Sequence, residues 1–356
     1  MVRAPEEFAT AAAPYVCVRI TDMREIDLAQ IRFDFDLTLA IVLMHADGTI
    51  LHRYGSRDAH DAMSWMSIPS LARLLREALV DHAAYDRGPP ASRPHKSWRA
   101  VDLPPLQRKL ARGQKLECVH CHTVHDMEHA DAVETGRWRD DDKWLYPEPA
   151  RVGLTLGAAD QELVQAVTAD SPAARAGLQR GDRLLHVGVQ ARVRTIADLE
   201  WALHKASPAA TRVPLSFVRG GQTRRAELVL SAGWKRCQPE DYAWRPYKWN
   251  LSPAAGFGGP ALAASEKQKL GLLPGRFAFR VNYIVDWGER AARGAAVTKA
   301  GIRKGDIVLA FAGKDDFLSV DHFHAFVALA CRAGQEVEVV LLRAGERKVV
   351  QLVLPE

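Results

Sequence analysis

Long apolar runs are missing from this chain of 356 residues. The most apolar run, Leu37–Met44, has the length of a strand and falls well short of the roughly eighteen residues that a membrane span needs. The segment from Met1 to Phe8 also lacks the apolar core that a signal peptide carries. The sequence therefore predicts no transmembrane segment.

The chain also has few cysteines and a small net charge. Only two of the five cysteines lie close together, which excludes a small domain held by a disulfide framework. The net charge is +5, from 48 basic and 43 acidic residues, and the basic residues form no stripe with interleaved aromatics. This pattern predicts no nucleic-acid partner. An ordinary composition, 47% hydrophobic and 26% charged, predicts a chain folded into about two to four small domains.

The most informative stretch is Cys118-Val119-His120-Cys121-His122, a C-x-x-C-H pattern. Two thiols three positions apart can bond to the two vinyl groups of one haem, and the following imidazole can coordinate the iron. The pattern predicts one c-type haem, attached at Cys118 and Cys121, with His122 as the proximal ligand.

Three nearby side chains are candidates for the sixth iron ligand: His125, Met127 and His129. His125 is only three residues from His122, and so short a link hinders it from reaching the opposite face of the haem. An open position, or a ligand from another domain, is the alternative. The same cluster of cysteine and histidine could instead hold zinc or copper, and the two cysteines could also stay unligated or form a disulfide.

Covalent haem would place the protein outside the cytoplasm, where c-type haem is attached. Because the sequence shows no leader, we expect one of three situations: a leader absent from this sequence, an unusual route of export, or a motif without haem. If haem is attached, the predicted compartment is periplasmic or otherwise extracytoplasmic.

Residues 1–85 are predicted to combine short strands with a helix, because β-branched runs, a hairpin turn and leucines at helical spacing follow one another. The predicted elements are strands over Tyr15–Ile20, Leu37–Met44 and Thr49–Tyr54, a turn at Asp47-Gly48, and a helix from Ser67 through Leu79. This order resembles the second half of a thioredoxin-like α/β domain. The region has no C-x-x-C, so the resemblance does not imply thiol–disulfide catalysis there. Cys17 is predicted to be a buried apolar thiol.

Residues 86–150 are predicted to be a linker and insert that carries the C-x-x-C-H motif. Prolines punctuate a polar, basic stretch over 86–117, which is typical of a linker. Trp138 and Trp144 follow the motif. An insert of about sixty residues is too short for a hydrophobic core of its own, so a bound haem would supply part of that core.

Beyond residue 151 the sequence repeats itself at an offset of 124 positions, so that Gly177 corresponds to Gly301. Three blocks share this offset without a gap: Ala176–Asp182 and Ala300–Asp306, Thr195–Leu199 and Ser319–Phe323, Val213–Arg219 and Val337–Arg343. The repeat predicts two copies of one domain, over 151–232 and 265–356. The connector over 233–264 is predicted to pack on a neighbouring domain, because it is rich in aromatic residues: Trp234, Tyr242, Trp244, Tyr247 and Trp249.

The run from Ser171 to Asp182 is similar to the most recognisable stretch of bacterial, protease-associated PDZ domains, and its A-G-(L/I)-x-x-G-D part occurs in both copies. The resemblance covers 153–231 and 265–355. It implies that a peptide adds a strand to a sheet edge while a loop of backbone N–H groups receives its terminal carboxylate.

Specific residues follow from this resemblance. In the first copy, Gly153, Leu154, Thr155 and Leu156 would form the carboxylate-binding loop. Leu199 and Leu203, on the following helix, would face the groove. In the second copy the corresponding loop would be 270–274, where Pro274 removes a donor and disfavours peptide binding. Alternatively, one or both copies would serve only as scaffold or dock internally.

Together the patterns predict an α+β multidomain chain: a partial thioredoxin-like α/β domain, a haem-binding-like insert, and two PDZ-like domains of barrel or sandwich type. The arrangement resembles multidomain exported proteins of bacteria such as planctomycetes.

Two functions follow. The first is an extracytoplasmic electron-transfer protein with one c-type haem, tethered through its PDZ copies to a redox partner. The second is a non-catalytic adaptor that binds peptide C-termini or protein segments, with zinc or nothing at the C-x-x-C-H motif. No constellation of protease or thiol–disulfide catalysis is visible in the sequence, so enzymatic activity is not predicted.

Overall fold

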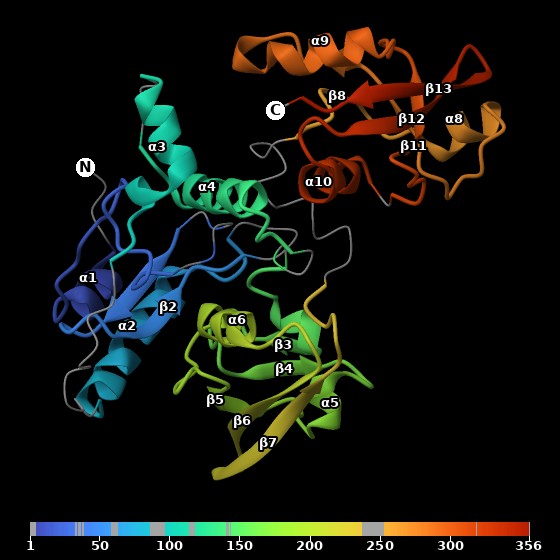
Figure 1. Cartoon of the computed structure of the whole chain (residues 1–356). Coiled ribbons are helices and arrows are strands. Elements are labelled where there is room, and N and C mark those ends of the chain that lie inside the picture. The colour runs from blue at the N-terminus through green and yellow to red at the C-terminus, as the bar shows by residue number, and fades with distance from the viewer. Residues whose placement is uncertain are drawn as a thin grey trace. The chain divides into compact units, whose positions relative to one another are not determined.

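The structure is a computed structural model that describes residues 5–32, 34, 37, 39–57, 63–85, 97–113, 118–139, 142, 144–236, 253–317 and 319–355. It divides into two compact units. Unit 1 comprises Met1–Asp131 and Arg137–Cys237, and unit 2 comprises Ala132–Gly136 and Gln238–Glu356. The described residues form a mixed α+β fold with several small sheets (Figure 1). This confirms the α+β class that the sequence predicts.

The predicted N-terminal hairpin is present in unit 1. Strands β1 (Ile41–Met44) and β2 (Ile50–Tyr54) pair antiparallel. Gly48 has a positive φ of 88°, which a glycine adopts without strain at the turn. Helices α1 (Glu6–Ala12) and α2 (Ile68–Ala83) share an apolar cluster with the hairpin. Helix α2 begins directly after Ser67, as predicted, and the Ser67 hydroxyl caps it by accepting from Ser70 N.

The strand predicted at Tyr15–Ile20 is wrong. The segment forms no regular element, and the side chains of Val16 and Val18 are 94% and 79% exposed. Alternating apolar residues make a strand only where a neighbouring strand pairs with them, and none does so among the described residues. Cys17 is accordingly exposed rather than buried. With β1 and β2 as a two-stranded sheet, the described residues do not show a thioredoxin-like domain.

The stretch predicted as a linker is folded over residues 97–113. The reason is that Pro104 and Pro105 occupy the first two positions of a helix, where proline is well tolerated, instead of interrupting the chain. The elements here are η1 (Ala100–Asp102), α3 (Pro104–Ala111) and α4 (Cys121–Glu134). Together with Met23 and Leu28 of the N-terminal segment, they build an apolar cluster around Leu103 and Leu106, so these elements are packed without haem.

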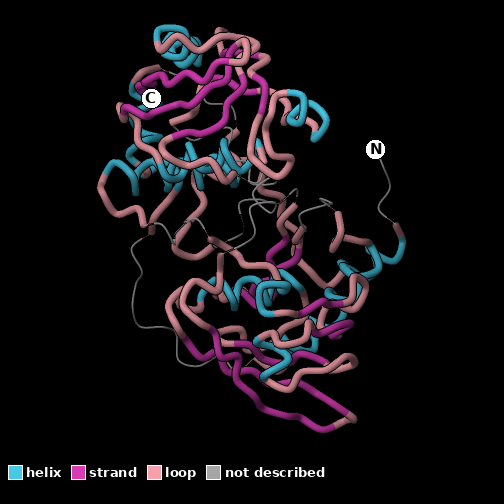
Figure 2. Tube along the Cα trace, turned by 90° about the vertical axis from the view of Figure 1, so that its right-hand side faces the viewer, coloured by secondary structure: helices cyan, strands magenta, loops and turns pink. Residues whose placement is uncertain are grey.

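The first repeat copy completes unit 1. Strands β3 and β4 form one sheet, and β5, β6 and β7 form a second sheet in that order. The β6–β7 hairpin is the longest pair and stands out in Figures 1 and 2. Its elements are η3 (Pro149–Val152), β3 (Leu154–Leu156), β4 (Val164–Val167), α5 (Pro172–Arg175), β5 (Arg183–Val187), α6 (Ile196–Lys205), β6 (Thr211–Arg219) and β7 (Gln222–Leu230).

Unit 2 contains the second repeat copy. One sheet has the order β13-β12-β11-β9, and a second sheet pairs β10 with β8. The elements are β8 (Phe257–Gly258), α8 (Ala264–Lys269), β9 (Phe279–Arg280), β10 (Tyr283–Ile284), η5 (Gly288–Arg290), α9 (Ala291–Lys299), β11 (Ile307–Phe311), α10 (Val320–Ala330), β12 (Glu336–Arg343) and β13 (Glu346–Val353).

The aromatic connector between the copies is only partly described. The indole Nε1 of Trp234 donates a hydrogen bond to Ser207 O at 2.8 Å, so this tryptophan packs on the first copy. Phe257 of the connector is described and buried, whereas Tyr242, Trp244, Tyr247 and Trp249 lie outside the described residues.

The sequence repeat is also a structural repeat within each unit. Strand β5 pairs with β6 in the same register, and with the same bulge, as β11 pairs with β12, at an offset of 124 residues throughout. The corner before each of these strands is braced in the same way. Arg219 bonds both carboxylate oxygens of Asp182, at 2.6 and 2.7 Å, and Arg343 does the same to Asp306.

Each brace is predicted to stabilise its own copy. The carboxylates of Asp182 and Asp306 are almost wholly buried. We expect Asp182→Asn and Asp306→Asn to lower the free energy of unfolding of the unit concerned by about 1–3 kcal/mol, because one oxygen becomes a donor that faces an arginine. Urea denaturation, with amide hydrogen exchange used to follow each unit separately, measures the free energy of unfolding of each unit.

The matched control is Asp315→Asn, which alters an exposed ion pair to Arg276 and should change stability by less than about 0.5 kcal/mol. An equal loss in all three variants would contradict a special role for the buried braces.

Candidate functional site: the edge of strand β3 and the cavity beside helix α4

Strand β3 has one edge without a partner. Gly153 O accepts from Thr168 N at 2.9 Å, and Gly157 N donates to Leu163 O at 3.0 Å, so both residues turn toward β4. Main-chain groups alternate along a strand, so those of Leu154 and Leu156 face the opposite edge. No main-chain group among the described residues pairs with that edge, which is therefore unpaired. Leu154 and Leu156 are each only 3% exposed, so neighbouring atoms cover the edge and must move aside before a strand can add to it.

The start of β3 depends on a glycine. Gly153 has a positive φ of 83°, and a Cβ placed there would lie 2.1 Å from the Cβ of Ser171. Its N–H already donates to Ala150 O at 3.0 Å. Within the predicted carboxylate-binding loop, Gly153 therefore shapes the backbone, and its N–H is not free to receive a carboxylate.

The apolar residues predicted to face a groove lie in the domain core. Leu199 and Leu203 on α6 have no exposed surface, and Leu154 and Leu156 on β3 are each only 3% exposed. All four belong to one buried cluster. The predicted role of Leu199 and Leu203 in facing a peptide groove stays a prediction. They lie on the face of α6 that the sheet covers, as their spacing of four residues requires.

The neighbouring face of α6 is covered by residues from elsewhere in unit 1. The Ser56 hydroxyl donates to the Glu200 carboxylate at 2.8 Å. The guanidinium of Arg53 lies 4.0 Å from the centre of the Trp201 ring. At the last turn of the helix, the ring of Tyr146 stacks on His204 with centroids 4.2 Å apart. The first copy is thus docked internally on this side.

A buried ionic cluster holds the hairpin against α6. His52 bonds Asp198 through Nδ1 at 2.8 Å and Asp81 through Nε2 at 3.0 Å, and Arg194 pairs with Asp81 at 2.7 Å. Neither His52 nor Asp198 has exposed surface. Burial alone would lower the pKa of His52, but its bonds to the two aspartates raise it to about 9. The sequence shows no signal for this cluster, because its members come from three distant segments.

The C-x-x-C-H motif lies where the chain enters α4. Cys118 is exposed, whereas Cys121, the first residue of α4, is half-buried. The ring of His122 lies 5.7 Å from that of His120. Burial, and then the neighbouring His120, lower the pKa of His122.

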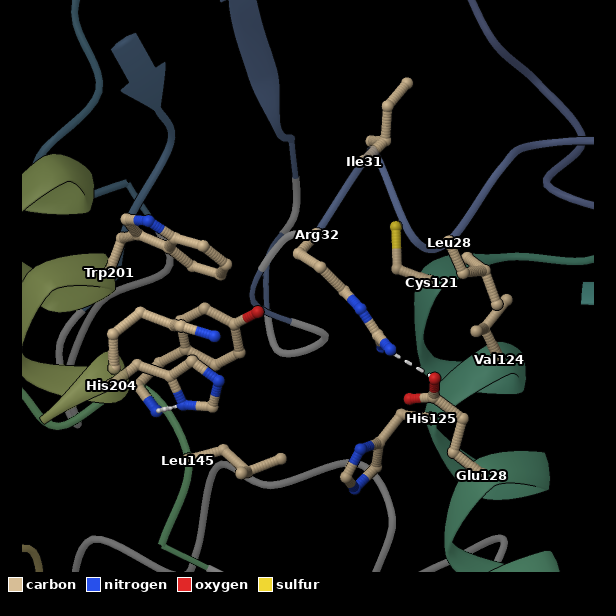
Figure 3. A pocket seen from close by; sticks show the side chains of 12 residues that line it. Leu28, Ile31, Arg32, Cys121, Val124, His125, Glu128, Leu145, Trp201 and His204 are labelled. Atoms are coloured by element: carbon tan, nitrogen blue, oxygen red, sulfur yellow. Dashed lines mark hydrogen bonds and ion pairs between the residues drawn. The ribbon is translucent and has the colours of Figure 1, made fainter. Parts of the chain in front are cut away.

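Beside α4 lies a cavity of about 300 Å³ (Figure 3). Cys121, His125 and Glu128 line it from α4, because positions four and seven residues beyond Cys121 share its face of the helix. Figure 3 shows Trp201 and His204 of α6 on the opposite side. The other lining residues are Leu28, Ile31, Arg32, Val124, Leu145, Tyr146 and Lys205.

The three predicted sixth ligands point to different surroundings. His125 lines the cavity, whereas Met127 packs in the apolar cluster with Val124. His129 is buried edge-on against Trp138, with ring centroids 4.2 Å apart. Burial lowers the pKa of His129 to about 4, so its ring is neutral near pH 7. His125 and His129 are four residues apart and share a face of α4, whereas Met127 lies on another face.

The haem and metal predictions can be tested against this geometry. A shared cradle for haem needs both cysteines and His122 on one space, but Cys118 and His122 do not line the cavity that Cys121 lines. Within the described ranges, no group of three or more His, Cys, Asp or Glu side chains is placed to hold a metal ion. Both haem c and zinc stay predictions for the C-x-x-C-H motif.

Charge in the cavity is partly balanced. Arg32 pairs with Glu128 at 2.7 Å. Burial raises the pKa of Glu128 and outweighs the opposite effect of Arg32. Burial also raises the pKa of the Cys121 thiol, and burial together with nearby lysines lowers that of His204 to about 3. Cys121 and His204 therefore present neutral groups to the cavity near pH 7. The Arg32–Glu128 salt bridge and the exposed Lys205 also line it.

The second copy has its loop in another place than predicted. Val285 N donates to Gly256 O at 2.8 Å, as Thr168 N does to Gly153 O, and both glycines have positive φ. Strand β8 pairs with β10 in the way that β3 pairs with β4. The loop is therefore the Gly-Phe-Gly stretch at 256–258, and the prediction of 270–274, which follows α8, is wrong. The G-F-G letters were the signal that could have located it.

Comparison with known proteins identifies one domain. A model of the PDZ domain matches residues 163–219, from β4 to β6, so the chain contains a PDZ domain in unit 1. A search of the curated proteins finds no match. No helix in the described part of the chain combines the length and apolarity that crossing a membrane requires.

Solved structures of proteases show partial similarity. The serine endoprotease from Yersinia pestis is 31% identical over 22% of this chain and 25% of its own, with a TM-score of 0.19. The HtrA-type protease AlgW with a decapeptide is 14% identical over 40% of this chain and 49% of its own, with a TM-score of 0.23. This chain thus spans between a quarter and a half of the length of these proteases.

The docking of the hairpin on α6 is predicted to depend on pH through His52. Because its folded pKa of about 9 lies above the ordinary value of 6.5, protonated His52 stabilises the fold. This contribution to the free energy of unfolding amounts to about 3 kcal/mol in all. It is complete below pH 6.5 and is lost as the pH rises through 9. Urea denaturation of the wild type and of His52→Gln between pH 6 and about pH 10 measures the difference.

His186→Gln, on strand β5, is the matched control and should keep the wild-type pH profile. A His52→Gln profile parallel to that of the wild type would show that the buried pair contributes nothing to this pH dependence.

Proposed function

We propose that unit 1 binds an extended segment of a partner protein, which adds as a strand to the outer edge of β3. The observation that carries this proposal is the unpaired edge of a strand in the PDZ copy of unit 1. PDZ domains bind peptides in this mode, with main-chain hydrogen bonds supplying affinity and side-chain pockets supplying specificity. The PDZ domain fits peptide or protein-segment binding, and the function is therefore that of an adaptor.

The geometry favours strand addition over capture of a terminal carboxylate. The N–H of Gly153 is already bonded to Ala150 O, whereas the main-chain groups of Leu154 and Leu156 face the open edge. An added strand would satisfy these groups whether or not it ends in a free carboxylate. The expected ligand is thus an extended, protein-derived segment, and a free C-terminus is not essential.

The second copy is proposed to be a PDZ-like domain too. Its shared strand register, its Asp306–Arg343 brace and its glycine loop at 256–258 support this. Electron transfer through a c-type haem stays a prediction. The motif spacing supports it, and the absence of a shared cradle among the described residues counts against it. The extracytoplasmic compartment and the redox partner depend on that haem and stay predictions likewise.

The open edge can be tested with a pair of variants at one position. Leu156→Pro removes the N–H that faces the open edge but breaks no bond to β4, so the strand should persist. Leu156→Ala loses a similar amount of packing and keeps the N–H. We expect the alanine variant to bind extended peptides from a display library within a few-fold of the wild type, and the proline variant to lose about tenfold or more.

Fluorescence polarisation with selected peptides, in acid and amidated forms, is the measurement. Circular dichroism of both variants controls for folding. Equal binding by the two variants would contradict strand addition at β3, and loss of binding on amidation alone would show carboxylate capture instead.

A further inference from the structure

The two thiols of the C-x-x-C pair differ in exposure, and the proposed adaptor function uses neither. Both cysteines are free thiols in the structure. Cys118 precedes α4 and is exposed, while Cys121 begins α4 and is half-buried. Cys118 lies three positions before Cys121, outside the helix, and this C-x-x-C spacing is the one that dithiol redox motifs use.

The thiol of Cys121 lines a cavity and, among the described residues, belongs to no metal-binding group. Cys121 opens onto the cavity beside α4, where Figure 3 shows it next to Arg32 and Leu28. Its helix neighbours on that face, His125 and Glu128, do not join it in a metal-binding group, as far as the described residues show. A pair of cysteines without a metal, one at the surface and one behind it, is arranged for thiol–disulfide exchange.

We infer that Cys118 and Cys121 form a reversible redox pair that reduces low-molecular-weight disulfides and is itself converted to an intramolecular disulfide. In the first step the sulfur of Cys118, as thiolate, attacks one sulfur of the substrate disulfide. The substrate S–S bond breaks, a mixed disulfide forms on Cys118, and the first substrate thiolate leaves and takes up a proton.

In the second step Cys121 attacks the Cys118 sulfur of the mixed disulfide. The Cys118–Cys121 bond forms, and the second substrate thiolate leaves and takes up the proton that Cys121 lost. The protein has then given up two electrons and two protons, and the substrate disulfide has received both. The second step is intramolecular, so it proceeds faster than attack by a further thiol from solution.

The exposure of each thiol fixes its role. An exposed Cys118 meets a substrate directly, whereas a half-buried Cys121 reaches the mixed disulfide most easily from inside. Cys118 does not line the cavity that Cys121 lines, so the substrate disulfide meets Cys118 at the surface of the protein.

A single tryptic peptide reports on the pair. Residues 116–137 contain Cys118 and Cys121, no other cysteine, and no lysine or arginine before the terminal Arg137. We would incubate the reduced full-length chain with glutathione disulfide, block the remaining thiols with an alkylating reagent, and weigh this peptide by mass spectrometry. The expected product is an unalkylated peptide with an internal disulfide and without bound glutathione.

Single variants separate the two roles. Cys121→Ala should trap glutathione on Cys118, because the second step is lost. Cys118→Ala should acquire glutathione on Cys121 at least about tenfold more slowly, since that thiol is less accessible. Cys17→Ala removes a separate exposed cysteine and should behave as the wild type does.

Three results would overturn the proposal. The wild-type peptide could carry glutathione without an internal disulfide, or both single variants could react at the same rate. Alternatively, expression in a host that matures c-type cytochromes could yield the same peptide with haem on both thiols. None of these results depends on peptide binding at β3, so the adaptor function and the redox pair fail or stand separately.

Discussion

One buried carboxylate, that of Asp198, holds helix α6 and the N-terminal hairpin together. It has no exposed surface and accepts three hydrogen bonds, from His52, from Arg53 N and from Arg194 N, at 2.8, 2.8 and 3.1 Å. A buried charge is tolerated only when its hydrogen bonds are complete. Removing one partner leaves a buried charge uncompensated, which destabilises the fold. The hairpin therefore cannot leave α6 without exposing or neutralising Asp198.

The two candidate sites of unit 1 depend on this arrangement. One face of α6 carries Leu199 and Leu203 into the core beneath β3, whose outer edge stays open. A neighbouring face carries Trp201 and His204, which form a wall of the cavity that Cys121 also lines. Because the hairpin fixes α6, it shapes both the proposed strand-binding edge and the cavity. The N-terminal segment is thus packed into unit 1 together with the PDZ domain.

Local features were predictable from the sequence, and features that depend on distant partners were not. The hairpin at Gly48, the start of a helix at Ser67 and the repeat at an offset of 124 residues each arise from short patterns, and the structure confirms them. The prediction of a strand at 15–20 was wrong because a strand needs a neighbouring strand to pair with, and the local sequence pattern does not show whether one is present. The prediction of a linker was wrong for residues 97–113, because the sequence alone does not distinguish prolines at the start of a helix from prolines in a loop.

The site itself was less predictable than the fold. Phe257 of β8 takes the place of Leu154 of β3 at an offset of 103 residues instead of 124, because the second copy has a longer segment between its loop and its corner. A search at one fixed offset therefore missed the loop. The cluster around His52 joins residues more than a hundred positions apart, and no local pattern announces such a contact. The C-x-x-C-H letters, in turn, do not tell a haem site from a dithiol, since that depends on which side chains share a space.

Amide hydrogen exchange measured by NMR tests strand addition at the unpaired edge of β3 most directly, because it needs no substitution. A bound strand must engage the main-chain groups that face outward, so the amides of Leu154 and Leu156 should become protected when an extended peptide is added. The amides of Thr155 and Gly157, which already face β4, should change little. Protection elsewhere, with Leu154 and Leu156 exchanging as in the free protein, would contradict strand addition to β3.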